Sequence, residues 1–161
     1  MTEALQDVII RSVREDDSFG WLIMRKKLWP DCPPEEHKAE IKSCLRGLDK
    51  LPVFVAEQVD GNLVGFLEAS IHHQQPHSTS ENVLYIEGWY VEPAFRKRDI
   101  GRMLLEKAEL WGRLKGFSEV FSDTEHHNTV SQKAHASLGF VEAYRNEEGI
   151  FYKKMLKPVD N

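Results

Sequence analysis

The segment VLYIEGWYV, residues 83–91, restricts the fold of this chain more than any other. Apolar side chains occupy both sets of alternating positions, so a strand here needs covering on both of its faces. The segment therefore predicts a central strand of a sheet, and Pro93 closes it. A cation-rich loop and a helical pattern from Ile100 to Lys115 follow directly, with Gly116 as the helix stop. We expect an α/β fold of the α+β kind, with a mixed central sheet.

Hydrophobic periodicity and turn residues predict the other elements. An Asp-Gly turn at residues 60–61 joins two strands, Asp16 or Asp17 is the expected N-cap of the first helix, and Pro30 ends that helix. Residues 72–82 are expected to form a polar loop. The order is β-α-α-β-β-β-α-β-α-β-β, with strands over 8–13, 52–58, 63–71, 83–91, 119–123, 140–145 and 150–155, and helices over 19–28, 35–48, 100–115 and 129–138.

Length and charge exclude several classes of protein. A chain of 161 residues that is 41% hydrophobic suits a single domain spanning residues 1–161. A formal net charge of −5 argues against a general nucleic-acid binder. The apolar runs are too short to cross a membrane, and MTEALQDVIIRS shows no signal-peptide pattern. We therefore expect a cytoplasmic protein with no nucleic-acid or membrane partner, in which Cys32 and Cys44 are reduced thiols.

Five histidines lie close together in two parts of the sequence, at His72, His73, His77, His126 and His127. Their spacing matches no strong metal motif. We interpret them as loop residues and expect no metal cofactor.

The stretch FRKRDIGRML, residues 95–104, brings four cations to the entrance of a helix. Free backbone N–H groups at a helix start bind phosphates, and the helix dipole adds to the attraction. A solvated charged face is the plain alternative for such a run. The stretch indicates an anion site without identifying the anion.

The longer stretch VEPAFRKRDIGRMLLEKAELWG resembles the acyl-CoA-binding motif of the GNAT acetyltransferase superfamily, Arg/Gln-x-x-Gly-x-Gly/Ala. Arg96 matches its first position and Gly101 its last. The resemblance implies the GNAT fold and acetyl-CoA as co-substrate, with loop amides around the pyrophosphate and Asn128 along the cofactor arm. The amides of the preceding strand would receive the acetyl and pantetheine end. The implied cofactor residues are Trp89, Tyr90, Val91, Arg96, Lys97, Arg98, Asp99, Ile100, Gly101, Arg102 and Asn128.

Four further stretches resemble the aminoglycoside 6'-N-acetyltransferases: RKKLWP, YIEGWYVEPAFRKR, SDTEHHNTVSQKAHASLGF and IFYKK. The correspondence runs from the first helix to the last strand, and so extends over nearly the whole chain. The resemblance implies transfer of acetyl from acetyl-CoA to the 6'-amino group of a cationic amino sugar, by direct attack in a ternary complex, which gives antibiotic resistance. It also implies a homodimer.

Asp99 departs from the motif, because it stands where the signature has its first glycine. Glycine there tolerates positive φ and lets the backbone approach a phosphate closely. An aspartate can instead cap the helix with its carboxylate, which takes the N–H groups that a pyrophosphate needs. We expect weakened rather than abolished cofactor binding.

Two acids are candidates for handling the amine. Glu87 stands in the middle of an apolar strand, where a carboxylate is costly unless it is paired or functional. Gly88 beside it suggests a bulge. The alternative for Glu87 is an ion pair with an arginine, and the alternative for Asp123 is that it, Thr124 or Asn128 caps the next helix. The resemblance places both acids at the amino sugar, and Asp123 is the candidate proton acceptor that an ammonium substrate requires.

Three further residues are implied more weakly. The resemblance places Trp29 against the aminoglycoside, although a tryptophan there is more often part of a core. His135 falls where many GNAT enzymes have a tyrosine that protonates the departing thiolate, and a buried packing role is the alternative. Tyr144 is a candidate substrate contact, and Tyr144 and Tyr152 are other possible proton donors.

Two rival functions remain compatible with the sequence. The first is the same chemistry on another amine, such as a polyamine or a protein N-terminus. The second is a degenerate, non-catalytic GNAT domain that only binds amines or acyl-CoA, which the substitution at Asp99 would suit.

Overall fold

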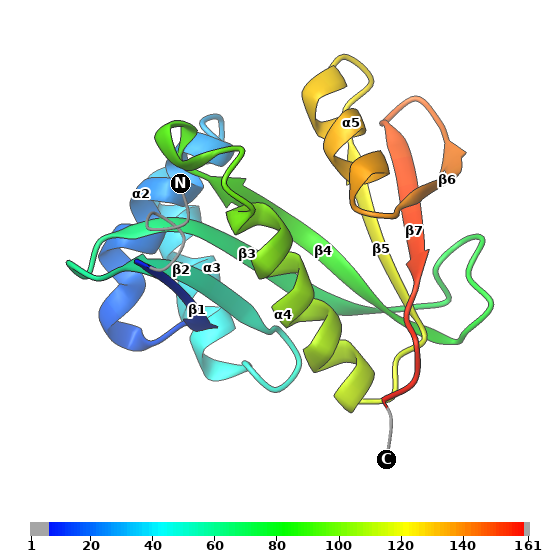
Figure 1. Ribbon diagram of the computed structural model, residues 1–161, viewed down its shortest axis with the longest axis horizontal. Helices are drawn as coiled ribbons and strands as arrows, with labels where there is room; N and C mark the ends of the chain where they lie inside the picture. Colours follow the sequence, from blue (N-terminus) through cyan, green and yellow to red (C-terminus); the bar gives the residue numbers. More distant parts are fainter. Residues whose placement is uncertain (1–6, 160–161) are drawn as a thin grey trace. The chain divides into compact units, whose positions relative to one another are not determined.

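The computed structural model describes residues 7–159 (Figure 1). Residues 1–6, part of the stretch considered for a signal peptide, lie outside the described residues. The predicted order of helices and strands is confirmed. The elements are β1 (Val8–Ser12), α2 (Ser18–Leu28), α3 (Pro34–Arg46), β2 (Val53–Gln58), β3 (Leu63–His73), β4 (Asn82–Val91), α4 (Ile100–Leu114), β5 (Glu119–Thr124), α5 (Thr129–Ser137), β6 (Val141–Arg145) and β7 (Ile150–Met155), with short 3-10 turns at Glu15–Asp17 and Pro93–Phe95.

The seven strands are hydrogen-bonded in the order β1-β2-β3-β4-β5-β7-β6. β5 runs parallel to β4, whereas β1, β6 and β7 pair with their neighbours in antiparallel fashion, so the expected mixed sheet is confirmed. Contacts group the chain into two compact units. The first contains the described residues up to Ala69 and Gly88–Ala108, and the second contains Ser70–Glu87 and the residues from Glu109 onward.

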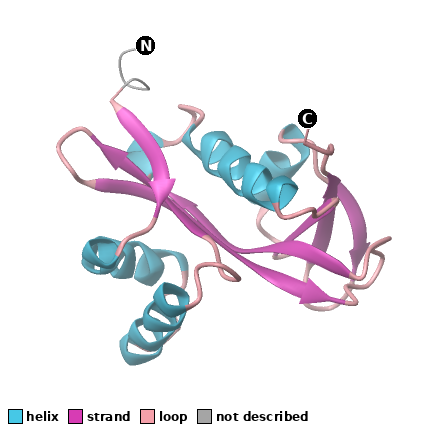
Figure 2. Cartoon of the chain, turned by 90° about the horizontal axis from the view of Figure 1, so that it is seen from below, coloured by secondary structure: helices cyan, strands magenta, loops and turns pink. Residues whose placement is uncertain are grey.

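In the first unit, helices cover both faces of the strands (Figure 2). Side chains of α2 and α3, including Trp21 and Ile41, pack with Phe66 of β3 into one apolar core. Gly65, the neighbour of Phe66, faces the other way, where a Cβ would meet Leu104 of α4 at 3.3 Å. Side-chain alternation along β3 therefore places Phe66 on the face covered by α2 and α3, and Gly65 on the face covered by α4.

In the second unit, β5, β7 and β6 form an antiparallel group, and α5 lies beside β5 and β7 (Figure 1). Val83, Tyr85 and Phe121 make its buried cluster. The ion pair between Lys154 and Glu109, 2.7 Å, links β7 to the end of α4. Gly116, the expected helix stop, and Gly139, which follows α5, have positive φ of 90° and 94°.

One local expectation is wrong, and a second is confirmed in position only. β3 continues to His73, so His72 and His73 lie on a strand rather than in a loop. Asp17 is the N-cap residue of α2, but its side chain makes no capping bond, because the carboxylate instead accepts two bonds of 2.8 Å from Arg11 and one of 2.7 Å from the N–H of Arg14. These bonds outweigh the effect of burial and lower the pKa of Asp17.

Within residues 7–159, no helix is long and apolar enough to cross a membrane.

Candidate active site

The loop before α4 has the backbone of an anion-binding site. Lys97 and Asp99 both have positive φ, 64° and 63°, on either side of Arg98. Alternation of this kind turns successive N–H groups toward one side and forms an anion-binding concavity. Arg96 is anchored at the edge of this loop, since its Nε donates to the carbonyl of Val91 at 2.8 Å. The residues present therefore fit a pyrophosphate.

Asp99 does not cap α4 as expected. Among the described residues, the recorded partner of its carboxylate is Arg102, with 3.5 Å between Oδ1 and Nη2. Both side chains are about half exposed, so this ion pair contributes little to stability. The first-turn N–H groups of α4 lack intrahelical acceptors, and the Asp99 carboxylate does not occupy them. What Asp99 brings to the site is a left-handed backbone, which is costly for a residue other than glycine, and a negative charge.

Strand β4 and the start of α4 are joined through Trp89. Its Nε1 donates to the carbonyl of Gly101 at 3.1 Å. A Cβ on Gly101 would be no closer than 3.7 Å to this indole, so packing alone does not require glycine at that position. Ile100 is 1% exposed and belongs to the core, which leaves its backbone as the part available to a ligand.

Glu87 lies on β4 with its side chain 42% exposed. Ser70 donates to its Oε2 at 2.5 Å, and Nε2 of His72 lies 2.6 Å from the same oxygen. The pairing with an arginine that the sequence allowed is not seen among the described residues. Oε1 has no recorded partner in the same part of the chain, so one carboxylate oxygen is held and the other is open.

Asp123 lies at the end of β5, where it is exposed. The phenol of Tyr85 donates to its Oδ2. The cap of α5 is Asn128, whose Oδ1 accepts from the N–H of Ser131 at 3.0 Å. The capping alternative therefore holds for Asn128 and not for Asp123. Burial, followed by the bond to Asp123, raises the pKa of Tyr85, so the phenol keeps its proton.

His135 is 3% exposed and connects α5 to β5. Its Nδ1 donates to the carbonyl of Ser131 at 2.8 Å, Nε2 lies 2.8 Å from the hydroxyl of Ser122, and its ring stacks on Tyr152. Burial lowers its pKa, which favours the neutral imidazole. This arrangement favours the packing alternative, and the role of His135 as a proton donor stays a prediction.

Tyr144 lies on β6 beside the loop that follows β3. Its hydroxyl accepts a bond of 3.1 Å from Gln75, and its ring stacks between His77 and Phe151, with centroids 4.8 and 4.5 Å away. The contact with substrate expected for Tyr144 stays a prediction.

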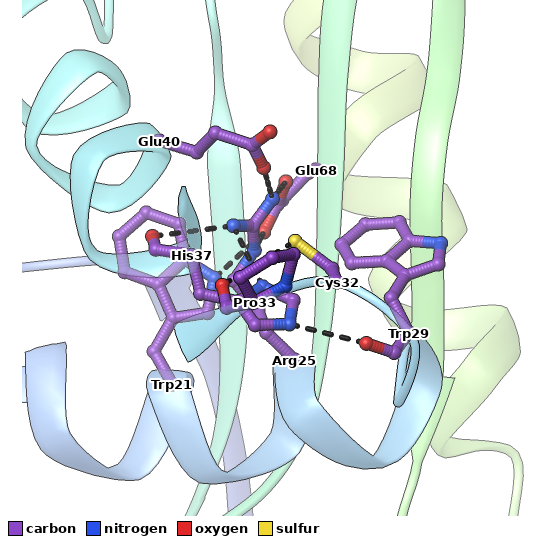
Figure 3. Close-up of polar contacts among 8 residues, drawn as sticks. All are labelled: Trp21, Arg25, Trp29, Cys32, Pro33, His37, Glu40 and Glu68. Atoms are coloured by element: carbon purple, nitrogen blue, oxygen red, sulfur yellow. Dashed lines mark hydrogen bonds and ion pairs between the residues drawn. The ribbon is translucent and has the colours of Figure 1, made fainter. Parts of the chain in front are cut away.

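Trp29, at the end of α2, is held by a buried polar network (Figure 3). Arg25 reaches from α2 to Glu40 of α3 at 2.5 Å and to Glu68 of β3 at 2.9 Å. Its guanidinium also lies 4.8 Å from the centre of the Trp29 ring. His37 donates from Nε2 to the carbonyl of Trp29 at 3.2 Å.

The sequence reasoning missed the side chains that hold the predicted site residues. In the second unit these are His72 and Tyr85, beside Glu87 and Asp123, and in the first unit Arg25, beside Trp29. The sequence could have indicated His72 and Tyr85, because alternate residues of a strand share one face of the sheet. The described residues contain no group of three or more His, Cys, Asp or Glu that could hold a metal ion.

Comparison with known proteins adds to this geometry. Residues 12–140 match the model of the acetyltransferase (GNAT) family. An aminoglycoside N(6')-acetyltransferase type 1 of Klebsiella aerogenes is 41% identical over 136 residues, which are 83% of this chain and 90% of that protein. A protein of the same name from Salmonella enteritidis is 39% identical over 146 residues, 90% of this chain and 97% of its own length.

Solved structures agree. A structure described as AAC(6')-Iy in complex with the bisubstrate analogue CoA-S-monomethyl-acetylneamine is 38% identical, with a TM-score of 0.81, and the match covers 86% of this chain and 94% of that one. The AAC(6')-Ig enzyme of Acinetobacter haemolyticus is 30% identical, with a TM-score of 0.80 over the same shares of the two chains. The match to the family model and the similarity to these relatives extend over most of the sequence, and the chain belongs to the GNAT acetyltransferase family.

Proposed function

We propose that this protein transfers the acetyl group of acetyl-CoA to the 6'-amino group of aminoglycoside antibiotics. The observation that carries the proposal is the similarity to relatives named aminoglycoside N(6')-acetyltransferase, at 39–41% identity over most of both chains. The two exposed carboxylates of Glu87 and Asp123 support it, because a polycationic sugar needs a negative site. The anion-binding loop before α4 supports the use of a CoA thioester.

Transfer is direct in this proposal. The amine loses a proton to Asp123 and attacks the thioester carbonyl, a C–N bond forms, the C–S bond breaks, and the thiolate of CoA takes up a proton. Amides of Trp89 to Val91 would polarise the carbonyl. The cysteines are poor acyl carriers, because burial raises the pKa of Cys44 to about 11 and also raises that of Cys32.

The proposal includes a cytoplasmic homodimer. Both cysteines are free, as expected in a reducing compartment. Val141 of β6 and Met155 of β7 are 60% and 58% exposed, so the C-terminal strands carry apolar side chains that a second copy would cover. Light scattering of the purified protein tests the dimer, and a monomer at micromolar concentration would contradict it.

The test of the activity is acetyl-CoA-dependent release of free CoA with a kanamycin-type aminoglycoside, with spermidine as the competing acceptor. We expect turnover on the sugar to exceed turnover on spermidine. Turnover on spermidine alone would favour the polyamine rival, and absence of acetyl-CoA binding by calorimetry would favour the non-catalytic one.

A further inference from the structure

We propose that His72 and Tyr85 are positioning residues of the acetyl-transfer site, which hold Glu87 and Asp123 as one linked pair. The inference rests on the proposed function, because His72 and Tyr85 can act in this way only if Glu87 and Asp123 receive the amine.

Strand alternation brings these side chains together. Ser70 and His72 are two residues apart on β3, and Tyr85 and Glu87 are two apart on β4. Residues at this spacing project from the same face of a sheet. The parallel register pairs Tyr85 of β4 with Phe121 of β5, so Asp123 lies two residues further along the neighbouring strand. Five polar or aromatic side chains thus meet on one face within the second unit.

The contacts form an unbroken series. His72 lies 2.6 Å from Oε2 of Glu87, and its ring stacks on Tyr85 with centroids 4.1 Å apart and planes 12° from parallel. The hydroxyl of Tyr85 in turn donates to Oδ2 of Asp123. Movement of either ring would therefore disturb both carboxylates.

Within the part of the chain that the structure describes, each carboxylate is held at one oxygen. Ser70 and His72 both bond to Oε2 of Glu87, and Tyr85 bonds to Oδ2 of Asp123. Oε1 and Oδ1 have no recorded partner among residues 7–159, and both side chains are exposed. A carboxylate fixed at one oxygen presents the other in a set direction, which is what an incoming amine requires.

A purely structural role predicts something different. Cross-strand pairs of this kind stabilise sheets modestly, so a structural role would lower the melting temperature and leave the kinetic constants unchanged. A positioning role predicts changed kinetic constants with little change in the melting temperature. Hydrogen bonds to charged groups are the stronger ones, so removing one should change transfer by about tenfold or more.

The test uses the full chain with acetyl-CoA and a kanamycin-type aminoglycoside. Tyr85→Phe keeps the stacked ring and removes the bond to Asp123, and we expect kcat to fall about tenfold with little change in the KM for acetyl-CoA. His72→Leu removes the bond to Glu87, and we expect the aminoglycoside KM to rise about tenfold. His72→Gln keeps an N–H near the position of Nε2 and should restore most of this loss.

His73→Leu is the matched control, because His73 is the next residue of β3 and points to the opposite face. It should leave both constants near those of the native protein. Because the stacked rings act as one unit, Tyr85→Phe and His72→Leu combined should cost less than the product of the single effects.

Kinetic constants within twofold of the native values in both single variants would overturn the inference, as would strictly multiplicative effects in the double variant. Native protein that acetylates no aminoglycoside would instead contradict the proposed function, so the two failures are distinguishable.

Discussion

The indole of Trp29 covers the α-carbon of Gly88 so closely that a Cβ at residue 88 would lie 2.8 Å from Cζ2 of the indole. The Arg25 guanidinium lies 4.8 Å from the centre of the Trp29 ring, and His37 donates to the Trp29 carbonyl, so both contacts hold this residue in place. Glycine is therefore required at residue 88 for packing, beside the acid that we assign to the amine.

Gly88→Ala tests this relationship. The added methyl group must displace Trp29 or bend β4, and we expect a loss of about 1–3 kcal/mol in the free energy of unfolding, as for other overpacked sites. The aminoglycoside KM should rise as well, because the strand carries Glu87. Urea denaturation and steady-state kinetics measure the two effects. Gly47→Ala is the control, since its Cβ would meet atoms no closer than 3.6 Å and its φ is −130°. If Gly88→Ala behaves like this control, the account of Gly88 is wrong.

The buried network around Arg25 should dominate the stability of the first unit. Arg25 is 3% exposed and Glu68 5%, and burial raises the pKa of Glu68 although Arg25 faces it. Arg25→Met leaves that carboxylate with the indole N–H of Trp21 but without its cationic partner, so we expect unfolding to become easier by about 3–5 kcal/mol. The exposed pair of Lys27 with Glu92 is the comparison, and Lys27→Met should leave the free energy of unfolding nearly unchanged.

Adding Glu68→Gln to Arg25→Met removes the stranded charge and should recover part of the loss. Equal stability of the Arg25→Met and Lys27→Met proteins in urea would contradict the importance of the network.

His135 makes stability depend on pH in a defined direction. Its pKa lies below the ordinary value of 6.5 because the ring is buried, so the unfolded chain binds the proton more readily than the folded one. The contribution of neutral His135 to the free energy of unfolding is fully present above pH 6.5. It is lost as the pH falls from that value toward the lowered pKa of the folded state. The free energy of unfolding, measured from pH 7.5 to 5, should fall less steeply in His135→Gln. Identical slopes in the two proteins would refute this reading.

Asp99 should weaken the binding of acetyl-CoA through two separable effects. Asp99→Asn removes the charge and keeps a residue that tolerates positive φ, whereas Asp99→Gly removes the charge and the backbone strain. We expect both to tighten acetyl-CoA binding in calorimetry, Asp99→Gly by more, with aminoglycoside affinity little changed. Unchanged or weaker binding in Asp99→Gly would show that the aspartate does not impair the site.

Periodicity and turn residues were enough to predict every helix and strand within a few residues. The Asp-Gly turn, the prolines and the helix-ending glycines act locally, so their effect is visible in the sequence. The partners of Glu87, Asp123 and Trp29 were not predicted, because each contact joins strands or helices distant in the chain. The prediction that Asp99 caps the helix was wrong for a different reason, since capping depends on a backbone angle that residue type alone does not determine.

The most direct test of the account is a comparison of aminoglycosides that differ at one position. Acetyl-CoA turnover should be seen with sugars that carry a 6'-amine and be absent with otherwise similar sugars that carry a 6'-hydroxyl. Equal turnover on both series, or turnover on neither, would contradict the assignment of this protein as an aminoglycoside 6'-N-acetyltransferase.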